Sequence, residues 1–350
     1  MSPDHSLVLN KEEIPMAVTA KELAALLGLS EAAVSLALNN KPGVSTATRK
    51  RIIETARQQG YDFSRKAGRL SATRGEICLV IYKKSGAVVS DTPFFSQLID
   101  GISLSCRKYH LGFVTRYVYE DDDVASQIFD LQAHSFAGLI VLATEMKRED
   151  LDIFAKLEVP LVFLDAYYDI PTWDFVCINN SQGAFMAASY LIRKRKAQPG
   201  YLRSNYPISN FDQRADGFYR AVRAAGMSAS QSIVHRLTPS QEGAYEDMKQ
   251  LLKEGEKPAS CYFADNDLIA LGAAEAFREA GFRIPEDIAL VGFDDLPACE
   301  YMTPGLTTVA VPKQYMGEVS VLRLLHLIDG GPSLPLSIQI FTRLVRRRSV

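Results

Sequence analysis

The 350-residue chain contains little cysteine, and its five cysteines stand far apart. None of them belongs to a CxxC pair, and their number is odd. A disulfide framework or a structural zinc site needs paired or closely spaced cysteines, so we expect reduced thiols in a cytosolic protein. Long hydrophobic runs are also missing. The longest apolar runs, such as 77–82, suit a buried strand and are too short to cross a membrane.

Two further absences narrow the function. The first residues, MSPDHSLVLNKEEIP, lack a basic start and an apolar core, so the sequence predicts no secretory signal peptide, and we interpret 1–15 as a mobile tail. The chain contains no GxSxG, HExxH, GxGxxG or GxxxxGK(S/T) motif, and its five histidines have no metal-ligand spacing. We therefore expect no catalytic residue, no metal and no cofactor.

The stretch TAKELAALLGLSEAAVSLALN contains two short helical patterns joined by a tight turn. Thr19 stands at an N-cap position, and Glu22 completes a capping box. Gly28 follows the first helix, where a left-handed residue is favoured, and Ser30 caps a second helix over about 31–38. The apolar positions are spaced to form one small core, namely Leu23, Ala24, Leu27, Val34 and Leu38. This pattern predicts a helix-turn-helix, a unit that binds the DNA major groove, although an ordinary αα-hairpin looks alike.

The residues that follow favour the DNA-binding interpretation. A third helix is expected over about 46–59, opened by Val44-Ser45 and stopped by Gly60. From 16 to 75, ten Lys and Arg stand against four Asp and Glu, a net charge of +6. The whole chain carries −2, so the remainder sums to −8. A basic N-terminal domain on an acidic body is typical of proteins that bind the phosphate backbone.

These residues resemble the headpiece of the lactose/galactose-repressor (LacI/GalR) family of bacterial transcription regulators. The resemblance runs across three expected helices without a gap, at Gly28-Leu29-Ser30, Val34-Ser35, Leu38-Asn39, Val44-Ser45, Thr48-Arg49 and Gly60-Tyr61. It implies a DNA-binding headpiece over 16–62. The DNA-binding residues that it implies are Thr19, Lys21, Ser30, Glu31, Ala32, Ser35, Leu36, Asn39, Ser45 and Leu70.

The base-reading positions depart from the habit of that family. An arginine commonly follows Val-Ser there and can bind guanine O6 and N7, whereas this chain has Leu36, which offers only apolar contact. Glu31 can accept from cytosine N4, and Ala32 can make only apolar contact. We expect modest base discrimination from this helix, with more weight on Leu70 and on DNA deformability. The alternative is that Leu36 turns inward and joins the headpiece core.

A short basic linker over 63–75 follows the headpiece. In the resembling family this linker is a hinge helix that forms on DNA, and its leucine enters the minor groove. Leu70 stands at that position, and the alternative is a plain linker with one apolar residue. Gly68 replaces the usual arginine and lowers helix propensity by up to about 1 kcal/mol.

From 76 onward, apolar strands alternate with helices, which predicts βαβ units and parallel sheets. The expected strands are 77–82, 113–119, 138–144, 161–166, 175–180, two near 201 and 233, 261–264 and 288–295. The expected helices are 94–110, 125–134, 149–157, 181–194, 213–225, 243–253 and 267–280. The fold class is thus an all-α helix-turn-helix headpiece plus an α/β body with two doubly wound sheets.

The same family resemblance continues to the C-terminus, through AGLIVL, VPLVFLDA, IALVGFDD and PGLTTVAVP. It implies a two-lobed body over 76–350 that resembles periplasmic binding proteins and forms the effector-binding and dimerisation domain. By its pattern the first lobe covers about 76–178 and 308–337. The second lobe covers about 179–307 and 338–350.

Ligands of doubly wound folds bind beyond the carboxyl ends of strands, where Asp165, Asn266 and Asp294 are expected, with Arg214 opening a helix after NFDQR. The resemblance places an effector cleft at Phe94, Asp165, Arg214, Asn266, Phe293 and Asp294. Such groups can bind the hydroxyls of a sugar, although Arg214 alone could equally hold a carboxylate or phosphate. A loop cap or a surface charge is the alternative for each residue taken singly. Trp173 either lines this cleft or packs elsewhere.

We therefore expect a transcriptional repressor that binds a near-palindromic operator as a homodimer, with a tetramer left open. Its second partner is a small effector, a sugar or sugar derivative. We expect it in the cytoplasm, associated with the nucleoid when bound to DNA, and away from the membrane. A periplasmic solute-binding protein is the alternative, but that class predicts a signal peptide and no basic headpiece. An enzyme on this fold would need a motif that the chain lacks.

Overall fold

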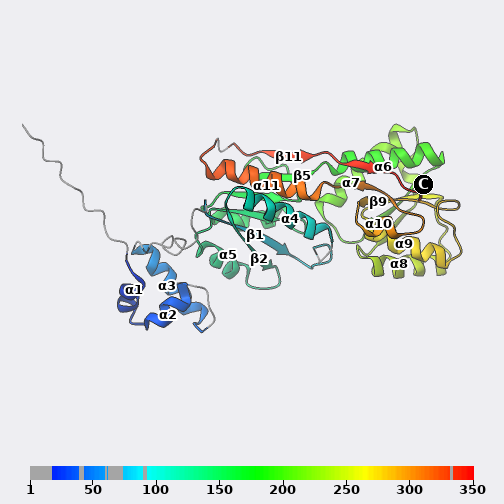
Figure 1. Ribbon diagram of the computed structural model, residues 1–350. Helices are drawn as coiled ribbons and strands as arrows, with labels where there is room; N and C mark the ends of the chain where they lie inside the picture. The colour runs from blue at the N-terminus through cyan, green and yellow to red at the C-terminus, as the bar shows by residue number, and fades with distance from the viewer. Residues whose placement is uncertain (1–17, 39–42, 60, 62–73, 90–92, 332–333) are drawn as a thin grey trace, which may run out of the picture. The chain divides into compact units, whose positions relative to one another are not determined.

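The computed structural model describes residues 18–38, 43–59, 61, 74–89, 93–331 and 334–350. The chain divides into two compact units, a small N-terminal headpiece and a larger body (Figure 1). Three expectations, the tail, Asn39 and the Leu70 hinge, lie outside the described residues.

The headpiece consists of three helices, α1 (Ala20–Leu27), α2 (Glu31–Leu38) and α3 (Thr46–Gln58). The expected caps are confirmed. The Thr19 hydroxyl accepts a hydrogen bond from the Glu22 N–H at 3.3 Å, and the Glu22 carboxylate accepts from the Thr19 N–H at 2.7 Å. Gly28 has φ +65°, the left-handed geometry that ends α1. The Ser30 hydroxyl accepts from the Ala33 N–H at 3.1 Å and so caps α2.

One small apolar core holds the three helices together. Its buried members come from all three helices and are Leu23, Ala24, Val34, Ala37, Ile52 and Ala56. Leu27 and Leu38 pack against this core and are half-buried. The core therefore forms largely as the spacing of the apolar residues predicts.

The body contains two six-stranded sheets. The first has the strand order β11-β5-β4-β3-β1-β2 and is parallel throughout. Its strands are β1 (Glu76–Lys83), β2 (Gly112–Tyr119), β3 (Gly138–Leu142), β4 (Leu161–Leu164), β5 (Asp174–Ile178) and β11 (Ser337–Ile340). Each inner strand is buried on both faces, as apolar runs of this kind predict.

The second sheet has the order β12-β10-β9-β8-β6-β7, and only its edge strand β12 is antiparallel. Its strands are β6 (Gly200–Ser204), β7 (Val234–Leu237), β8 (Cys261–Ala264), β9 (Ala289–Asp294), β10 (Thr307–Ala310) and β12 (Arg343–Val345). The predicted class, a helical headpiece with a two-lobed α/β body, is confirmed.

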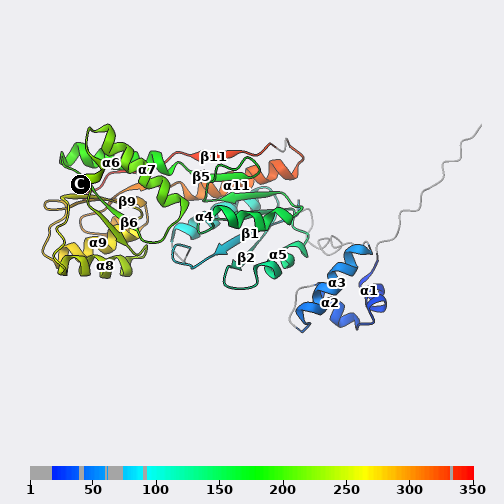
Figure 2. The same cartoon turned by 180° about the vertical axis from the view of Figure 1, so that it is seen from behind.

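Helices cover the two sheets. They are α4 (Pro93–Lys108), α5 (Val124–Gln132), α6 (Asn180–Arg195), α7 (Ser209–Ala224), α8 (Gln241–Lys253), α9 (Asp267–Glu279), the short α10 (Ala298–Tyr301) and α11 (Lys313–Ile328). Helices α4 and α11 pack together beside the first sheet, whereas the pairs α6–α7 and α8–α9 pack beside the second. Figures 1 and 2 show that two elements from the last part of the chain, α11 and β11, belong with the first sheet, where β11 is the edge strand next to β5.

The chain passes between the lobes three times, after β5, after β10 and after β11. Two of these crossings lie a few residues from the expected bounds of the lobes. Strand β10 belongs to the second sheet through Ala310, although the first lobe was expected to resume at about 308. Strand β11 belongs to the first sheet through Ile340, although the second lobe was expected from about 338.

Other details differ locally. The helix expected over 149–157 is a 3-10 helix over Arg148–Lys156. The helix expected from 213 begins at Ser209, so Arg214 lies within its second turn and does not open it. All five cysteines are buried and unpaired. Every helix in the described part of the chain is too short or too polar to span a bilayer.

Candidate functional site: a polar pocket between the two lobes

A pocket that is partly open to solvent lies where the carboxyl ends of the strands of both sheets meet. Its apolar walls are Val88, Phe94, Phe95, Ile208, Phe211, Pro239, Leu268 and Leu296. Its polar side chains are Thr144, Asp165, Asn210, Arg214, Asn266 and Asp294. An apolar cleft with a few convergent polar groups is the usual form of a small-molecule site.

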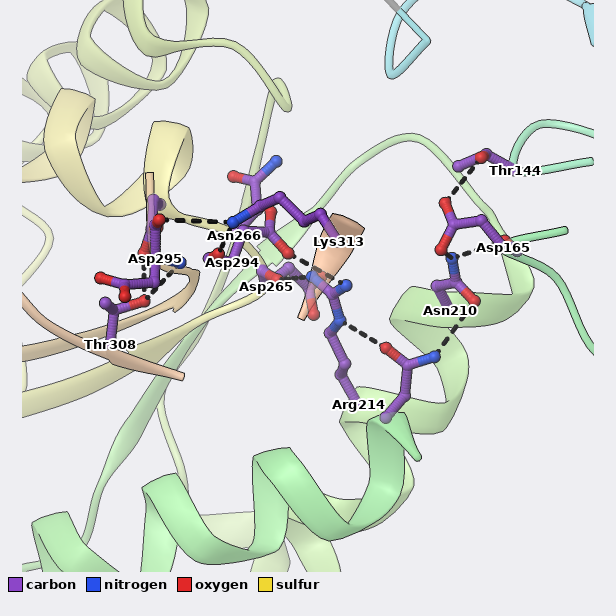
Figure 3. A network of polar contacts seen from close by, with 12 residues as sticks. Thr144, Asp165, Asn210, Arg214, Asp265, Asn266, Asp294, Asp295, Thr308 and Lys313 are labelled. Atoms are coloured by element: carbon purple, nitrogen blue, oxygen red, sulfur yellow. Dashed lines mark hydrogen bonds and ion pairs between the residues drawn. The ribbon is translucent and has the colours of Figure 1, made fainter. Parts of the chain in front are cut away.

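Four of these side chains, Thr144, Asp165, Asn210 and Arg214, join through Asn180 in one series of hydrogen bonds that crosses from the first lobe to the second (Figure 3). The Thr144 hydroxyl donates to an oxygen of Asp165 at 2.7 Å. The Asn210 amide donates to the Asp165 carbonyl oxygen at 3.0 Å, across the lobes. The Asn180 amide donates to the Asn210 oxygen at 3.1 Å. Arg214 Nε then donates to the Asn180 oxygen at 2.9 Å, so the two lobes are joined by a continuous polar network.

Arg214 lies at the centre of the second-lobe half of this network. Besides its bond to Asn180, its guanidinium donates to the backbone oxygen of Asp265 and, at 3.4 Å, to the Asp294 carboxylate. Its central carbon lies 3.8 Å from the centroid of the Phe293 ring. The side chain of Arg214 is buried, so these contacts fix the guanidinium before any ligand binds.

The end of β9 has an unusual backbone that a buried lysine supports. Asp294 and Asp295 both have positive φ, +114° and +55°, which is unfavourable for residues other than glycine. Lys313, the first residue of α11, donates from Nζ to the carbonyl oxygens of both residues. The strained turn aims Asp294 at the pocket, and the lysine ties it to the crossing between the lobes.

Three buried carboxyl groups lie in or beside the pocket, those of Asp165, Asp265 and Asp294. Burial raises the pKa of Asp165 to about 7, against the opposing effects of the Thr144 hydrogen bond and the Arg214 charge. Burial likewise raises the pKa of Asp265 to about 6, although the Tyr201 hydroxyl donates to it. Burial also raises the pKa of Asp294, which the Arg214 charge opposes. The sequence predicts Asp165 and Asp294, and the structure adds that burial raises the pKa of both carboxyl groups.

Five of the six expected effector residues line this pocket, namely Phe94, Asp165, Arg214, Asn266 and Asp294. Phe293 is fully buried beneath Arg214 and does not line it. Asn266 also caps α9, because its side-chain oxygen accepts from the Ile269 N–H at 2.8 Å. Trp173 packs its ring edge-on against Phe163, 5.4 Å between centroids, and is absent from the lining.

Sequence reasoning missed several residues of this site. Thr144 follows β3. It could therefore have been predicted as Asp165 was, because ligands of doubly wound folds bind beyond the carboxyl ends of strands. Asn210 and Asn180 had no such signal, because their role depends on how the lobes meet. Lys313 had none either, because its partners are backbone carbonyls. In the described part of the chain no three His, Cys, Asp or Glu side chains gather as metal ligands.

The headpiece presents a second candidate surface on α1 and α2. The side chains of its expected DNA-contacting residues are exposed at Thr19, Lys21, Ser30, Glu31, Ala32, Ser35 and Ser45. Leu36 is half-buried and lies outside the headpiece core. Its backbone oxygen, and that of Ala37, accept from Arg49, which ties α2 to α3. Asn39 and Leu70 lie outside the described residues.

Two family models match the chain. One describes bacterial regulatory proteins of the lacI family and matches residues 19–63. The other describes a periplasmic binding protein-like domain and matches residues 188–350. The first range contains the helix-turn-helix, and the second contains Arg214, Asn266 and Asp294 of the interlobe pocket.

Similar proteins share both parts. The HTH-type transcriptional regulator GalR of Escherichia coli (strain K12) is 30% identical over 342 residues, covering 95% of each chain. The lac repressor dimer bound to operator and the anti-inducer ONPF has a TM-score of 0.70 at 24% identity, covering 95% of this chain and 99% of that one. A LacI family regulator from Enterococcus faecium with bound ribose has a TM-score of 0.67 at 26% identity, covering 78% and 98%. The chain belongs to the lacI family of bacterial regulatory proteins and is a DNA-binding transcriptional regulator.

Proposed function

We propose that this regulator is a repressor that binds a near-palindromic operator as a homodimer and changes its affinity when a sugar or sugar derivative fills the interlobe pocket. The observation that carries the proposal is the polar chain from Thr144 to Arg214, whose members come from both lobes. A ligand that replaces some of these bonds would change how the lobes meet. That is the kind of two-state element on which allostery depends.

The pocket chemistry favours an uncharged, polyhydroxylated effector over an anion. Each of the three nitrogens of Arg214 already donates to a protein oxygen, and Asp294 compensates its charge. Asp165 adds a second acidic group to the wall. A phosphate or carboxylate would meet these acidic groups, whereas hydroxyl groups can donate to the carboxylates and accept from the two remaining N–H groups of Arg214. The ribose bound to the Enterococcus faecium regulator is a ligand of this class.

The DNA-binding side of the proposal rests on the headpiece. The proposed base-reading residues are Glu31, Ala32 and Leu36, which lie on α2, the second helix of the motif. Thr19, Ser35, Asn39 and Ser45 are the proposed phosphate contacts, and Leu70 the proposed minor-groove wedge. One such helix reads too few base pairs for specific binding, which favours a dimer on a symmetric site.

The proposed domains follow the same division. They are a tail over 1–15, a headpiece over 16–62, a hinge over 63–75 and an effector-binding and dimerisation body over 76–350. A protein that acts on chromosomal DNA works in the cytoplasm, which is the location we propose. The alternative, a solute-binding protein without a DNA role, leaves the capped helix-turn-helix unexplained. An enzymatic role is not proposed, since the named relatives are regulators.

Two measurements on the full chain test the proposal. Selection of binding sites from random DNA, followed by footprinting, should give two half-sites in inverted orientation. One unpaired half-site, or no protection of any DNA, would contradict the dimeric repressor. Thermal denaturation with a panel of neutral sugars, sugar phosphates and sugar acids should show stabilisation by a neutral sugar, because a ligand of the folded state raises the melting temperature. Stabilisation by anionic sugars alone would refute the assigned effector class.

A further inference from the structure

A buried carboxylate lies next to the pocket but outside the polar chain described above. Glu145 follows Thr144 after β3, and its side chain is 2% exposed. Its two oxygens accept five hydrogen bonds from the backbone of the segment 84–89. One oxygen accepts from the N–H groups of Lys84, Ser85 and Gly86 at 3.0, 3.1 and 3.0 Å, and the other from Val88 and Val89 at 2.7 and 2.9 Å.

The sixth N–H group of this segment is also satisfied, because Ala87 donates to the Ser85 hydroxyl at 3.1 Å. Every backbone N–H from 84 to 89 therefore has an acceptor. Concave arrays of backbone N–H groups commonly bind anions. Here a side chain of the same chain occupies the array, so the conformation of the segment depends on one carboxylate.

The segment 84–89 is both a wall of the pocket and a contact between the lobes. Val88 lines the pocket together with Asp165. The Ser85 side chain lies close enough to Tyr206, which follows β6 in the second lobe, to lower the pKa of the Tyr206 hydroxyl against the raising effect of burial. A displacement of the segment would therefore alter the shape of the pocket and the fit of the lobes together.

Glu145 and its neighbour Thr144 thus act on two different walls. Thr144 holds the Asp165 side chain, and Glu145 holds the Val88 segment. We propose that Glu145 is a positioning residue of the effector pocket, whose carboxylate fixes segment 84–89 in the shape that binds the effector and meets the second lobe. This inference rests on the effector site proposed above.

Glu145→Gln in the full chain tests it, with Glu149→Gln as the matched control. Glu149 lies four residues further on, and its side chain is exposed. A glutamine offers one acceptor oxygen and one amide donor, so it cannot serve both groups of N–H donors. Because buried N–H groups without acceptors are costly, we expect hydrogen exchange over 84–89 to accelerate roughly tenfold while the rest of the body exchanges as in the wild type.

A functional measurement accompanies the exchange experiment. D-ribose, cellobiose and D-galactose are screened for one that raises the wild-type melting temperature. With that sugar, the concentration that half-maximally changes binding to the selected operator should rise roughly tenfold in Glu145→Gln, as expected for the loss of about 1.4 kcal/mol. Operator affinity without sugar should stay within about twofold, because the substitution leaves the DNA-binding residues intact. Glu149→Gln should match the wild type in both measurements.

Three results would overturn the proposal. The first is that segment 84–89 stays as protected from exchange in Glu145→Gln as in the wild type. Exchange could accelerate throughout the body, which would make Glu145 a general stabilising residue. The sugar response could stay unchanged although the segment exchanges faster. If no sugar in the panel stabilises the wild type, the proposed effector class is wrong, and the exchange pattern alone decides the role of Glu145.

Discussion

The guanidinium of Arg214 lies over the ring of Phe293, with 3.8 Å between its central carbon and the ring centroid. Phe293 precedes Asp294, which the same guanidinium contacts at 3.4 Å. Phe293 therefore packs against one face of the guanidinium, and Asp294, the next residue of β9, compensates its charge. These two contacts let the Arg214 cation remain in a buried pocket. Removing the Arg214 side chain should therefore affect both stability and ligand binding.

We predict that Arg214→Ala abolishes the effector response and lowers the free energy of unfolding of the body by about 3 kcal/mol. The substitution leaves the Asp294 carboxylate buried without its charge partner, a loss that typically costs 3–5 kcal/mol. Urea denaturation and calorimetric titration of the effector measure the two effects. Arg223→Ala is the control, since Arg223 is exposed at the end of the same helix. Normal effector titration in Arg214→Ala would remove Arg214 from the proposed site.

A second prediction concerns pH. Burial raises the folded-state pKa of Asp165 to about 7, well above the value near 4 in an unfolded chain. The folded state therefore binds a proton that the unfolded state has lost. The stability that comes from the protonated Asp165 carboxyl is fully present below about pH 4 and is lost as the pH rises to about 7. We expect Asp165 to reduce the unfolding free energy of the wild type by about 2 kcal/mol between about pH 5 and pH 7.

Asp165→Asn removes the titrating group, so the unfolding free energy of this variant should fall less over the same pH range. Chemical denaturation without effector at each pH gives the comparison. Asp169→Asn is the control, because Asp169 is exposed on the loop that follows β4. If the two variants and the wild type show the same pH dependence, the Asp165 carboxyl does not titrate near neutrality.

A third prediction concerns the packing of α4 on α11. A Cβ atom at Gly101 would lie 2.1 Å from the backbone oxygen of Gln314, so the two helices would have to separate. We expect Gly101→Ala to lower the free energy of unfolding by about 2 kcal/mol, within the range typical of overpacked cores. Asp100→Ala, next to it on the exposed face, should have little effect. Equal stability of the two variants in urea would show that the helices adjust freely.

The fourth prediction concerns operator choice. Leu36→Arg should shift the selected half-site towards a guanine, because a guanidinium binds guanine O6 and N7 together and discriminates by about 1–3 kcal/mol. Leu26→Arg is the control, because Leu26 is 61% exposed on α1 and receives the same added charge. Sites selected from random DNA should be unchanged in the control apart from affinity. An unchanged half-site in Leu36→Arg would mean that Leu36 does not face the bases.

Much of the fold could be predicted from short-range signals. Thr19, Gly28 and Ser30 perform the capping roles that their side chains favour. Alternating apolar strands predicted both sheets, and the position of Asp165 and Asp294 after strands predicted that they line a cleft. Each of these caps, strands and strand-end residues could be predicted from the sequence within a few residues of it.

The interactions that could not be predicted join distant segments. Asn210 meets Asp165 only because the two lobes close on each other. Glu145 accepts from N–H groups nearly sixty residues earlier, and backbone donors leave no mark on the sequence. Phe293 was expected to line the pocket because it precedes Asp294 in the sequence. In the structure Arg214 covers its ring, so Phe293 packs under the guanidinium and does not line the pocket.

The three crossings between the lobes also affect the order in which the two sheets can fold during synthesis on the ribosome. Strand β11 completes the first sheet and β12 completes the second, yet both lie within Ser337–Val345. Neither sheet can therefore acquire its last edge strand while the preceding 330 or so residues are emerging from the exit tunnel. We expect nascent chains that stop before Ser337 to expose two unfinished sheet edges and to be removed by proteases, so that both lobes reach their final form in the same late step of synthesis.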